Sequence, residues 1–130
     1  MRCYIGIGSN LDNPERQVAL AIEALHHLPR SAFVAASSRH ASTPQGPQDQ
    51  PDFCNAVAAI DCRLPPFDLL RELQAIERAR GRITGPRWGA RIVDLDLLLY
   101  GDLRMDSALL TVPHPALSKR DFVLYPLAEI

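Results

Sequence analysis

The chain has few cysteines and no long apolar run, and each shortage excludes a class of protein. Its three cysteines (Cys3, Cys54 and Cys62) are an odd number without C-x-x-C spacing, which argues against a disulfide framework or a zinc site. We expect them to be small core residues in a reducing compartment. No all-apolar run, that of residues 56–60 included, is longer than five residues, which is far too short to span a membrane, and the N-terminus lacks the apolar core of a signal peptide. The expected location is the cytoplasm, with no membrane partner.

An excess of positive charge is also lacking. Fourteen Lys and Arg face fifteen Asp and Glu, giving a formal net charge of −1. A protein whose main partner is a nucleic acid needs a basic face, so we expect no nucleic-acid partner. The 130 residues, 47% of them hydrophobic, are enough to build one core. We therefore expect a single domain over residues 1–130.

The apolar periodicity alternates between strands and helices along the chain. It predicts strands over residues 3–8, 32–38, 53–62 and 93–100, and helices over residues 14–28 and 66–80. Asn13 and Pro14 are typical of the start of a helix. The β-α-β-β-α-β order is that of a ferredoxin-like α+β fold, an αβα sandwich with a mostly antiparallel sheet. Both helices would then cover one sheet face, leaving the face that carries Gly6 and Gly8 open to a ligand.

The Asp94-Leu95-Asp96 triplet is the most informative local pattern. Residues two apart in a strand point to the same side, so both carboxylates would share one face while Leu95, Leu97 and Leu99 point to the core. A cation between the two carboxylates would relieve their repulsion, and Mg²⁺ combines a few carboxylates with phosphate oxygens. A solvated polar face is the alternative, but the pair interrupts an otherwise apolar strand, which favours metal binding.

An arginine series precedes this strand. Its members are Arg78, Arg80, Arg82, Arg87 and Arg91, with the only tryptophan, Trp88, among them. A basic helix end explains the first two, whereas the last three lie beyond Gly81 and could close over a polyphosphate. Trp88 could equally anchor this loop or stack on a ring. No P-loop or dinucleotide fingerprint is present, so phosphate handling would depend on arginines and metal.

Two further sets of polar residues have ordinary interpretations when taken alone. Gln74 and Glu77 lie three apart on one side of the predicted second helix, where polar residues are usually just solvated. His114, in Val-Pro-His-Pro, would lie in an extended segment, and a lone histidine is more often structural than catalytic.

Several motifs, in one order along essentially the whole chain, resemble the 6-hydroxymethyl-7,8-dihydropterin pyrophosphokinase family. They are residues 4–11 (YIGIGSNL), 46–53 (GPQDQPDF) with Asn55, 81–82 (GR), 87–89 (RWG) with Arg91, 94–97 (DLDL), 111–114 (TVPH), Arg120, Phe122 and 126–127 (PL). The family's αβα fold agrees with the predicted element order. The resemblance implies a monomeric transferase of tetrahydrofolate biosynthesis, which moves the pyrophosphoryl group of ATP to a hydroxymethyl dihydropterin and releases AMP.

The resemblance also implies a role for each matching residue. Asp94 and Asp96 would bind two Mg²⁺ ions that bridge the ATP phosphates, and Arg82 and Arg91 would steady the transferring group. The residues around ATP would be Gln74, Glu77, Trp88, Leu97, Leu110, Thr111, His114 and Arg120. The pterin pocket would consist of Ser42, Thr43, Gln45, Phe53, Asn55 and Phe122.

Two other classes of function are compatible with parts of this pattern. An RNA-binding module can share the β-α-β-β-α-β order, but it needs aromatic residues on its central strands and a basic sheet face. The expected face here carries glycines, Asn55 and two carboxylates, which would repel a nucleic-acid backbone. A pterin-sensing domain without catalysis is the second alternative, and the presence of both aspartates and the loop arginines argues against it.

Overall fold

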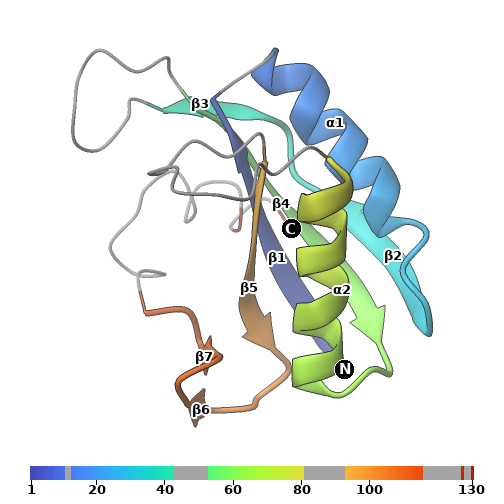
Figure 1. Cartoon of the computed structure of the whole chain (residues 1–130), viewed down its shortest axis with the longest axis vertical. Coiled ribbons are helices and arrows are strands. Elements are labelled where there is room, and N and C mark those ends of the chain that lie inside the picture. The colour runs from blue at the N-terminus through green and yellow to red at the C-terminus, as the bar shows by residue number, and fades with distance from the viewer. Residues whose placement is uncertain (11–12, 43–52, 81–92, 116–126, 128–129) are drawn as a thin grey trace.

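The computed structural model describes residues 1–10, 13–42, 53–80, 93–115, 127 and 130 (Figure 1). The main sheet consists of β1 (Arg2–Ser9), β2 (Ser31–Ala36), β3 (His40–Ser42), β4 (Phe53–Cys62) and β5 (Asp94–Tyr100). The helices are α1 (Pro14–Leu25) and α2 (Pro66–Ala79), and two short strands, β6 (Met105–Asp106) and β7 (Thr111–Val112), form a separate hairpin.

The sheet has the order β2-β4-β1-β5, with β3 also paired to β4, and every pair is antiparallel. This topology confirms the ferredoxin-like α+β prediction. The predicted second strand corresponds to β2, which ends two residues earlier than predicted, and the short strand β3, on the same side of β4, was not predicted. Between β2 and β3, Ser37 and Val57 exchange two hydrogen bonds: the Ser37 N–H donates to the Val57 carbonyl, and the Val57 N–H donates to the Ser37 hydroxyl.

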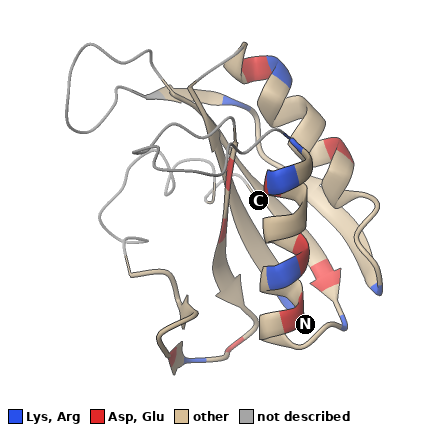
Figure 2. Ribbon diagram, in the orientation of Figure 1, with Lys and Arg blue, Asp and Glu red and all other residues tan. Residues whose placement is uncertain are grey.

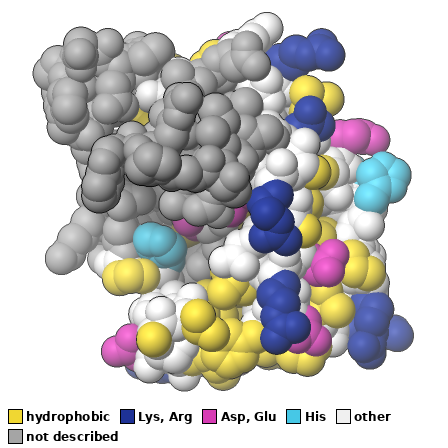
Figure 3. Space-filling model, in the orientation of Figure 1, with side chains coloured by type: hydrophobic (Ala, Val, Ile, Leu, Met, Phe, Trp, Pro, Cys, Tyr) yellow, Lys and Arg dark blue, Asp and Glu magenta, His cyan; other side chains and the backbone are white. Residues whose placement is uncertain are grey.

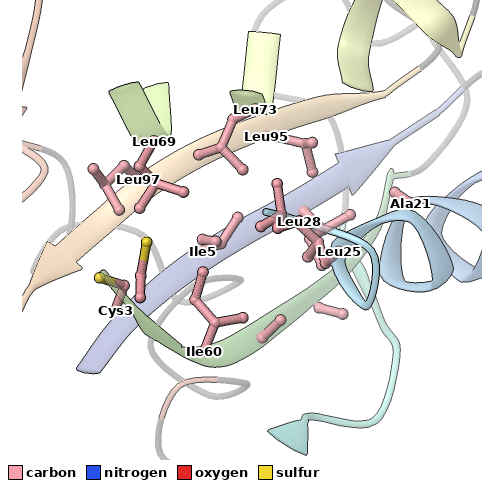
Figure 4. Close-up of a cluster of buried hydrophobic side chains, with 14 of the residues drawn as sticks. Cys3, Ile5, Ala21, Leu25, Leu28, Ile60, Leu69, Leu73, Leu95 and Leu97 are labelled. Atoms are coloured by element: carbon pink, nitrogen blue, oxygen red, sulfur yellow. The ribbon is translucent and has the colours of Figure 1, made fainter. Parts of the chain in front are cut away.

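The core lies between the sheet and both helices, as expected. Alternate residues of β1, among them Cys3 and Ile5, are fully buried against apolar side chains of both helices (Figure 4). α1 contributes Leu25 and α2 contributes Leu69 and Leu73 to this cluster. Burial of such a stripe on each helix provides the main driving force for the arrangement.

The start and end of α1 differ from the predicted details. Asn13 precedes the helix but has φ 64° and no side-chain capping hydrogen bond. The helix ends at Leu25, three residues earlier than predicted. Beyond it the N–H groups of His26 and His27 donate to carbonyls three residues back, which continues the chain as a tight turn. Leu28 still belongs to the core, so the apolar pattern continues beyond the end of the helix.

The sheet face turned away from the helices, here called the second face, is the one that carries Gly6 and Gly8. Gly8 pairs with Asp94 and Gly6 with Asp96, so both carboxylates lie on this face. The face is only partly open, because Val57 and Leu98 beside Gly6 are almost fully buried.

A β-bulge in β5 shifts the pairing with β1. Ile5 pairs with Leu97 but Tyr4 pairs with Leu99, which leaves Leu98 as the extra residue. The prediction that Leu99 faces the core is therefore wrong: Tyr100 takes that place opposite Cys3, and its hydroxyl donates to the Leu64 carbonyl. Strict alternation could not reveal the inserted residue.

All three cysteines are buried and free, which confirms that they are core residues. Burial, with Cys62 nearby, raises the pKa of the Cys3 thiol to about 12. Burial also raises the pKa of Cys54 and of the Tyr100 hydroxyl. In the described part of the chain, no helix combines the length and apolarity needed to cross a membrane.

Candidate active site

Asp94 and Asp96 form the acidic end of β5 (Figure 2). Both are half-buried on the second face, as the sequence predicts. Among the described residues, no group of three or more His, Cys, Asp or Glu side chains is placed to hold a metal ion. A pair of carboxylates suits Mg²⁺, because this ion usually takes one or two carboxylates together with water and substrate phosphate oxygens.

Glu77 supports this acidic end from α2. Its side chain is only 4% exposed, and its carboxylate accepts the N–H of Leu95 at 2.9 Å. Among the described strands of the main sheet β5 lies at the edge, so none of them lies beyond it to accept this N–H, which faces away from β1. Glu77 therefore fixes the backbone between the two aspartates.

A pocket of about 270 Å³ opens next to Asp96, between α2, β5 and the β6–β7 hairpin. Five residues predicted for the nucleotide or the metal line it, namely Asp96, Leu97, Leu110, Thr111 and His114. Its other lining residues are Leu70, Leu95, Ser107, Ala108, Leu109 and Pro115. Apolar side chains gather over the hairpin and the adjoining start of α2 (Figure 3). Because ligand pockets commonly measure about 300–1,000 Å³, this one suits a part of a nucleotide such as its base and sugar.

Hydrogen bonds hold the hairpin side of the pocket in place. The Ser107 hydroxyl donates to the Leu110 carbonyl at 3.0 Å and accepts the Leu110 N–H at 3.1 Å. The Thr111 hydroxyl donates to a carboxylate oxygen of Asp106 at 3.1 Å. The N–H of His114 donates to the Leu98 carbonyl at 2.9 Å, which attaches the segment after β7 to β5. Side-chain and backbone hydrogen bonds together thus hold this wall of the pocket in place.

Gln74 lies on α2 four residues after the pocket residue Leu70 and three before Glu77. Residues three and four apart share one side of a helix, so Gln74 belongs to the side that faces β5 and the pocket. It is half-buried there.

The predicted pterin residues that the structure describes lie on β3 and β4, and β1 separates these strands from β5. Asn55 is 5% exposed, pairs with Gly8, and its amide Nδ2 donates to the His40 carbonyl at 3.5 Å. Phe53, two residues earlier on the same face, is half-buried and pairs with Ser42. The structure thus brings Ser42, Phe53 and Asn55 together at one end of β4.

Seven of the residues predicted for the site lie outside the described residues. They are Thr43, Gln45, Arg82, Trp88, Arg91, Arg120 and Phe122. Their roles stay predictions.

Sequence reasoning missed the hairpin itself and three of the pocket residues that it contributes, Ser107, Ala108 and Leu109, whereas the family resemblance had indicated Leu110 and Thr111. β6 and β7 have two residues each, too few for alternation to be recognised. Leu70 could have been found, because it lies four residues before Gln74 on the same side of the helix.

Comparisons with known proteins point to one family. The sequence model of the family described as 7,8-dihydro-6-hydroxymethylpterin-pyrophosphokinase matches residues 4–130. Proteins named 2-amino-4-hydroxy-6-hydroxymethyldihydropteridine pyrophosphokinase are similar to this chain. The one from Pseudomonas aeruginosa is 49% identical over 99% of this chain and 80% of its own length. The one from Haemophilus influenzae is 48% identical over 98% and 79%, and the one from Bacillus subtilis is 40% identical over 98% and 76%.

Proposed function

The chain belongs to the 7,8-dihydro-6-hydroxymethylpterin-pyrophosphokinase family, and from this premise we propose how its described residues perform the reaction. The enzyme transfers the pyrophosphoryl group of ATP to the hydroxymethyl oxygen of 6-hydroxymethyl-7,8-dihydropterin in tetrahydrofolate biosynthesis. The observation that carries the assignment of sites is the pocket that joins Leu110, Thr111 and His114 to Asp96. Such a pocket would place a nucleotide with its phosphates next to a carboxylate pair.

Magnesium dependence is part of the proposal. Asp94 and Asp96 would hold two Mg²⁺ ions, supported by their common face, their partial exposure and the hard oxygen ligands they offer. When bound, the ions would neutralise the phosphate oxygens and polarise the β-phosphorus. Glu77 would keep the two carboxylates on their face by holding the Leu95 N–H.

The two substrates would approach from opposite sides of β1. The base and sugar of ATP would fill the pocket beside β5, with Gln74 on its α2 side. The pterin would stack on Phe53 and place its polar edge at Asn55, on β4. The acceptor oxygen and the β-phosphorus would then meet over β1, and catalysis would depend mainly on positioning and charge neutralisation. Arg82 and Arg91 are the candidates for neutralising the transferring group.

A product assay tests the reaction. ATP, Mg²⁺ and enzyme are incubated with and without the hydroxymethyl dihydropterin, and AMP and ADP are separated chromatographically. We expect AMP to form only when the pterin is present. ADP as the nucleotide product would indicate transfer of a single phosphoryl group, and AMP without pterin would indicate hydrolysis, so either result contradicts the proposal.

We also propose that the enzyme acts as a cytoplasmic monomer. The three free thiols support a reducing compartment. The edge strand β2 is short and carries an irregularity between Phe33 and Ala35, a feature that discourages pairing with another copy. Light scattering at micromolar concentration measures the oligomeric state.

A further inference from the structure

Gly8 lies in the sheet between the two halves of the candidate site. It pairs with Asn55 of β4 on one side and with Asp94 of β5 on the other. Only Gly101, among the described glycines, has a positive φ, so the backbone of Gly8 does not itself require glycine. Glycine inside a strand costs about 0.5–1 kcal/mol relative to alanine. Another reason is therefore needed for the missing side chain.

That reason is the amide of Asn55. A Cβ added at Gly8 would lie 3.1 Å from the Asn55 Oδ1 and would meet no other described atom within 4 Å. This separation is shorter than an ordinary carbon–oxygen contact, so the amide would have to shift. Asn55 is 5% exposed and its Nδ2 donates to the His40 carbonyl, which limits where the amide can go.

We propose that Gly8 is a positioning residue for the acceptor substrate. Its lack of a side chain lets the Asn55 amide lie directly against β1, where the amide can bind the polar edge of the pterin. This inference rests on the proposed function, and specifically on the assignment of Asn55 to the pterin. A side chain at Gly8 should affect the binding of the pterin and not that of the nucleotide, because no described atom of Asp94 lies within 4 Å of the added Cβ.

Gly6 offers a matched control on the same strand and face. A Cβ at Gly6 would come no closer than 3.4 Å to the ends of the Leu98 side chain, an ordinary contact with atoms that can move. Gly6→Ala and Gly8→Ala therefore add the same methyl group two residues apart, and only the second displaces Asn55.

The experiment compares Gly8→Ala, Gly6→Ala, Asn55→Ala and the double variant Gly8→Ala/Asn55→Ala. Calorimetry measures the Kd of the hydroxymethyl pterin and, separately, of a non-hydrolysable ATP analogue with Mg²⁺. Gly8→Ala should weaken pterin binding on the order of tenfold, the loss of one hydrogen bond. It should change nucleotide binding by less than about twofold, and Gly6→Ala should change pterin binding by less than about twofold. In the Asn55→Ala background, Gly8→Ala should have almost no further effect on pterin binding.

Wild-type pterin affinity in Gly8→Ala overturns the inference, as does an equal loss with and without Asn55. Wild-type affinity in Asn55→Ala would remove the premise, and the AMP assay then shows separately whether the proposed reaction still holds. If Gly8→Ala alone fails to fold, thermal melting of the double variant shows whether the clash with Asn55 is the cause. Recovery of folding on removal of Asn55 supports the contact, and no recovery overturns it.

Discussion

The carboxylates of Asp94 and Asp96 lie on β5, and the proposed pterin residue Asn55 lies on β4, with β1 between them. If these carboxylates hold the proposed Mg²⁺ ions, Asp94→Asn or Asp96→Asn should lower kcat by about a hundredfold or more, because stabilisation of transition-state charge by a metal is worth several kcal/mol. Pterin binding should stay measurable. The assays are AMP release at saturating Mg²⁺ and pterin calorimetry, with the exposed Asp68→Asn as a charge-matched control. Near-normal turnover in both variants would disprove the metal assignment.

Two substitutions of Glu77 distinguish the effect of its hydrogen bond to Leu95 from the effect of its charge. Glu77→Gln retains an oxygen that can accept the Leu95 N–H, whereas Glu77→Ala leaves this N–H without its acceptor. The alanine variant should lose about 1–3 kcal/mol of unfolding free energy, the cost of an unsatisfied buried group. It should also need more Mg²⁺ for half-maximal activity than the glutamine variant. Denaturant unfolding and Mg²⁺ titration measure the two effects, and equal behaviour of both variants would contradict the positioning role.

At the scale of elements, the β6–β7 hairpin forms one wall of the pocket proposed for the nucleotide. Ser107→Ala removes both hydrogen bonds between the serine hydroxyl and Leu110, so the wall should loosen. We expect the KM for ATP to rise about three- to tenfold, because each bond is worth about 0.5–1.5 kcal/mol, with little change in kcat. Steady-state kinetics check this.

A suitable control is Ser31→Ala. Ser31 also donates to a backbone carbonyl, that of Pro29, but it lies on β2, at the opposite edge of the sheet from β5. An equal KM change in both variants would mean that the hairpin has no special role.

Elements with strong periodicity could be predicted, and irregular ones could not. β4 begins and ends at the predicted residues, and β5 begins one residue later than predicted. The bulge at Leu98 was not predictable, because an inserted residue in an all-apolar run leaves no trace in the alternation. The same holds for the site: Asp94 and Asp96 could be placed on one face from their spacing, but the hydrogen bond from Leu95 to Glu77 depends on how α2 packs.

At the scale of the whole molecule, buried thiol and tyrosine hydroxyl groups set an upper pH limit for the stability of the fold. The pKa of the Cys3 thiol is raised to about 12, and those of Cys54 and Tyr100 are raised too, by burial. The unfolded chain therefore loses these protons first as pH rises. The contribution of these groups to the free energy of unfolding is fully present below about pH 9 and should fall above it. The loss is about 1.4 kcal/mol per pH unit for each thiol that is ionised in the unfolded chain but not in the folded one.

Thermal melts between pH 7 and pH 11 measure this loss. Cys3→Ala should flatten the decline above pH 9, whatever its effect on the Tm at pH 7. The same slope in the variant and the wild type would show that Cys3 does not contribute.

The central position of β1 has a consequence for how the enzyme is made on the ribosome. β1 precedes the other described strands in the chain, yet its neighbours are β4 and β5, and more than half of the chain separates Gly8 from its partner Asp94. A nascent chain that ends before β5 has no carboxylate pair beside β1 and an unpaired edge in the middle of the future sheet. Contacts between such distant segments form slowly. The carboxylate pair and the part of the pocket that β5 lines can therefore form only after most of the chain has been synthesised.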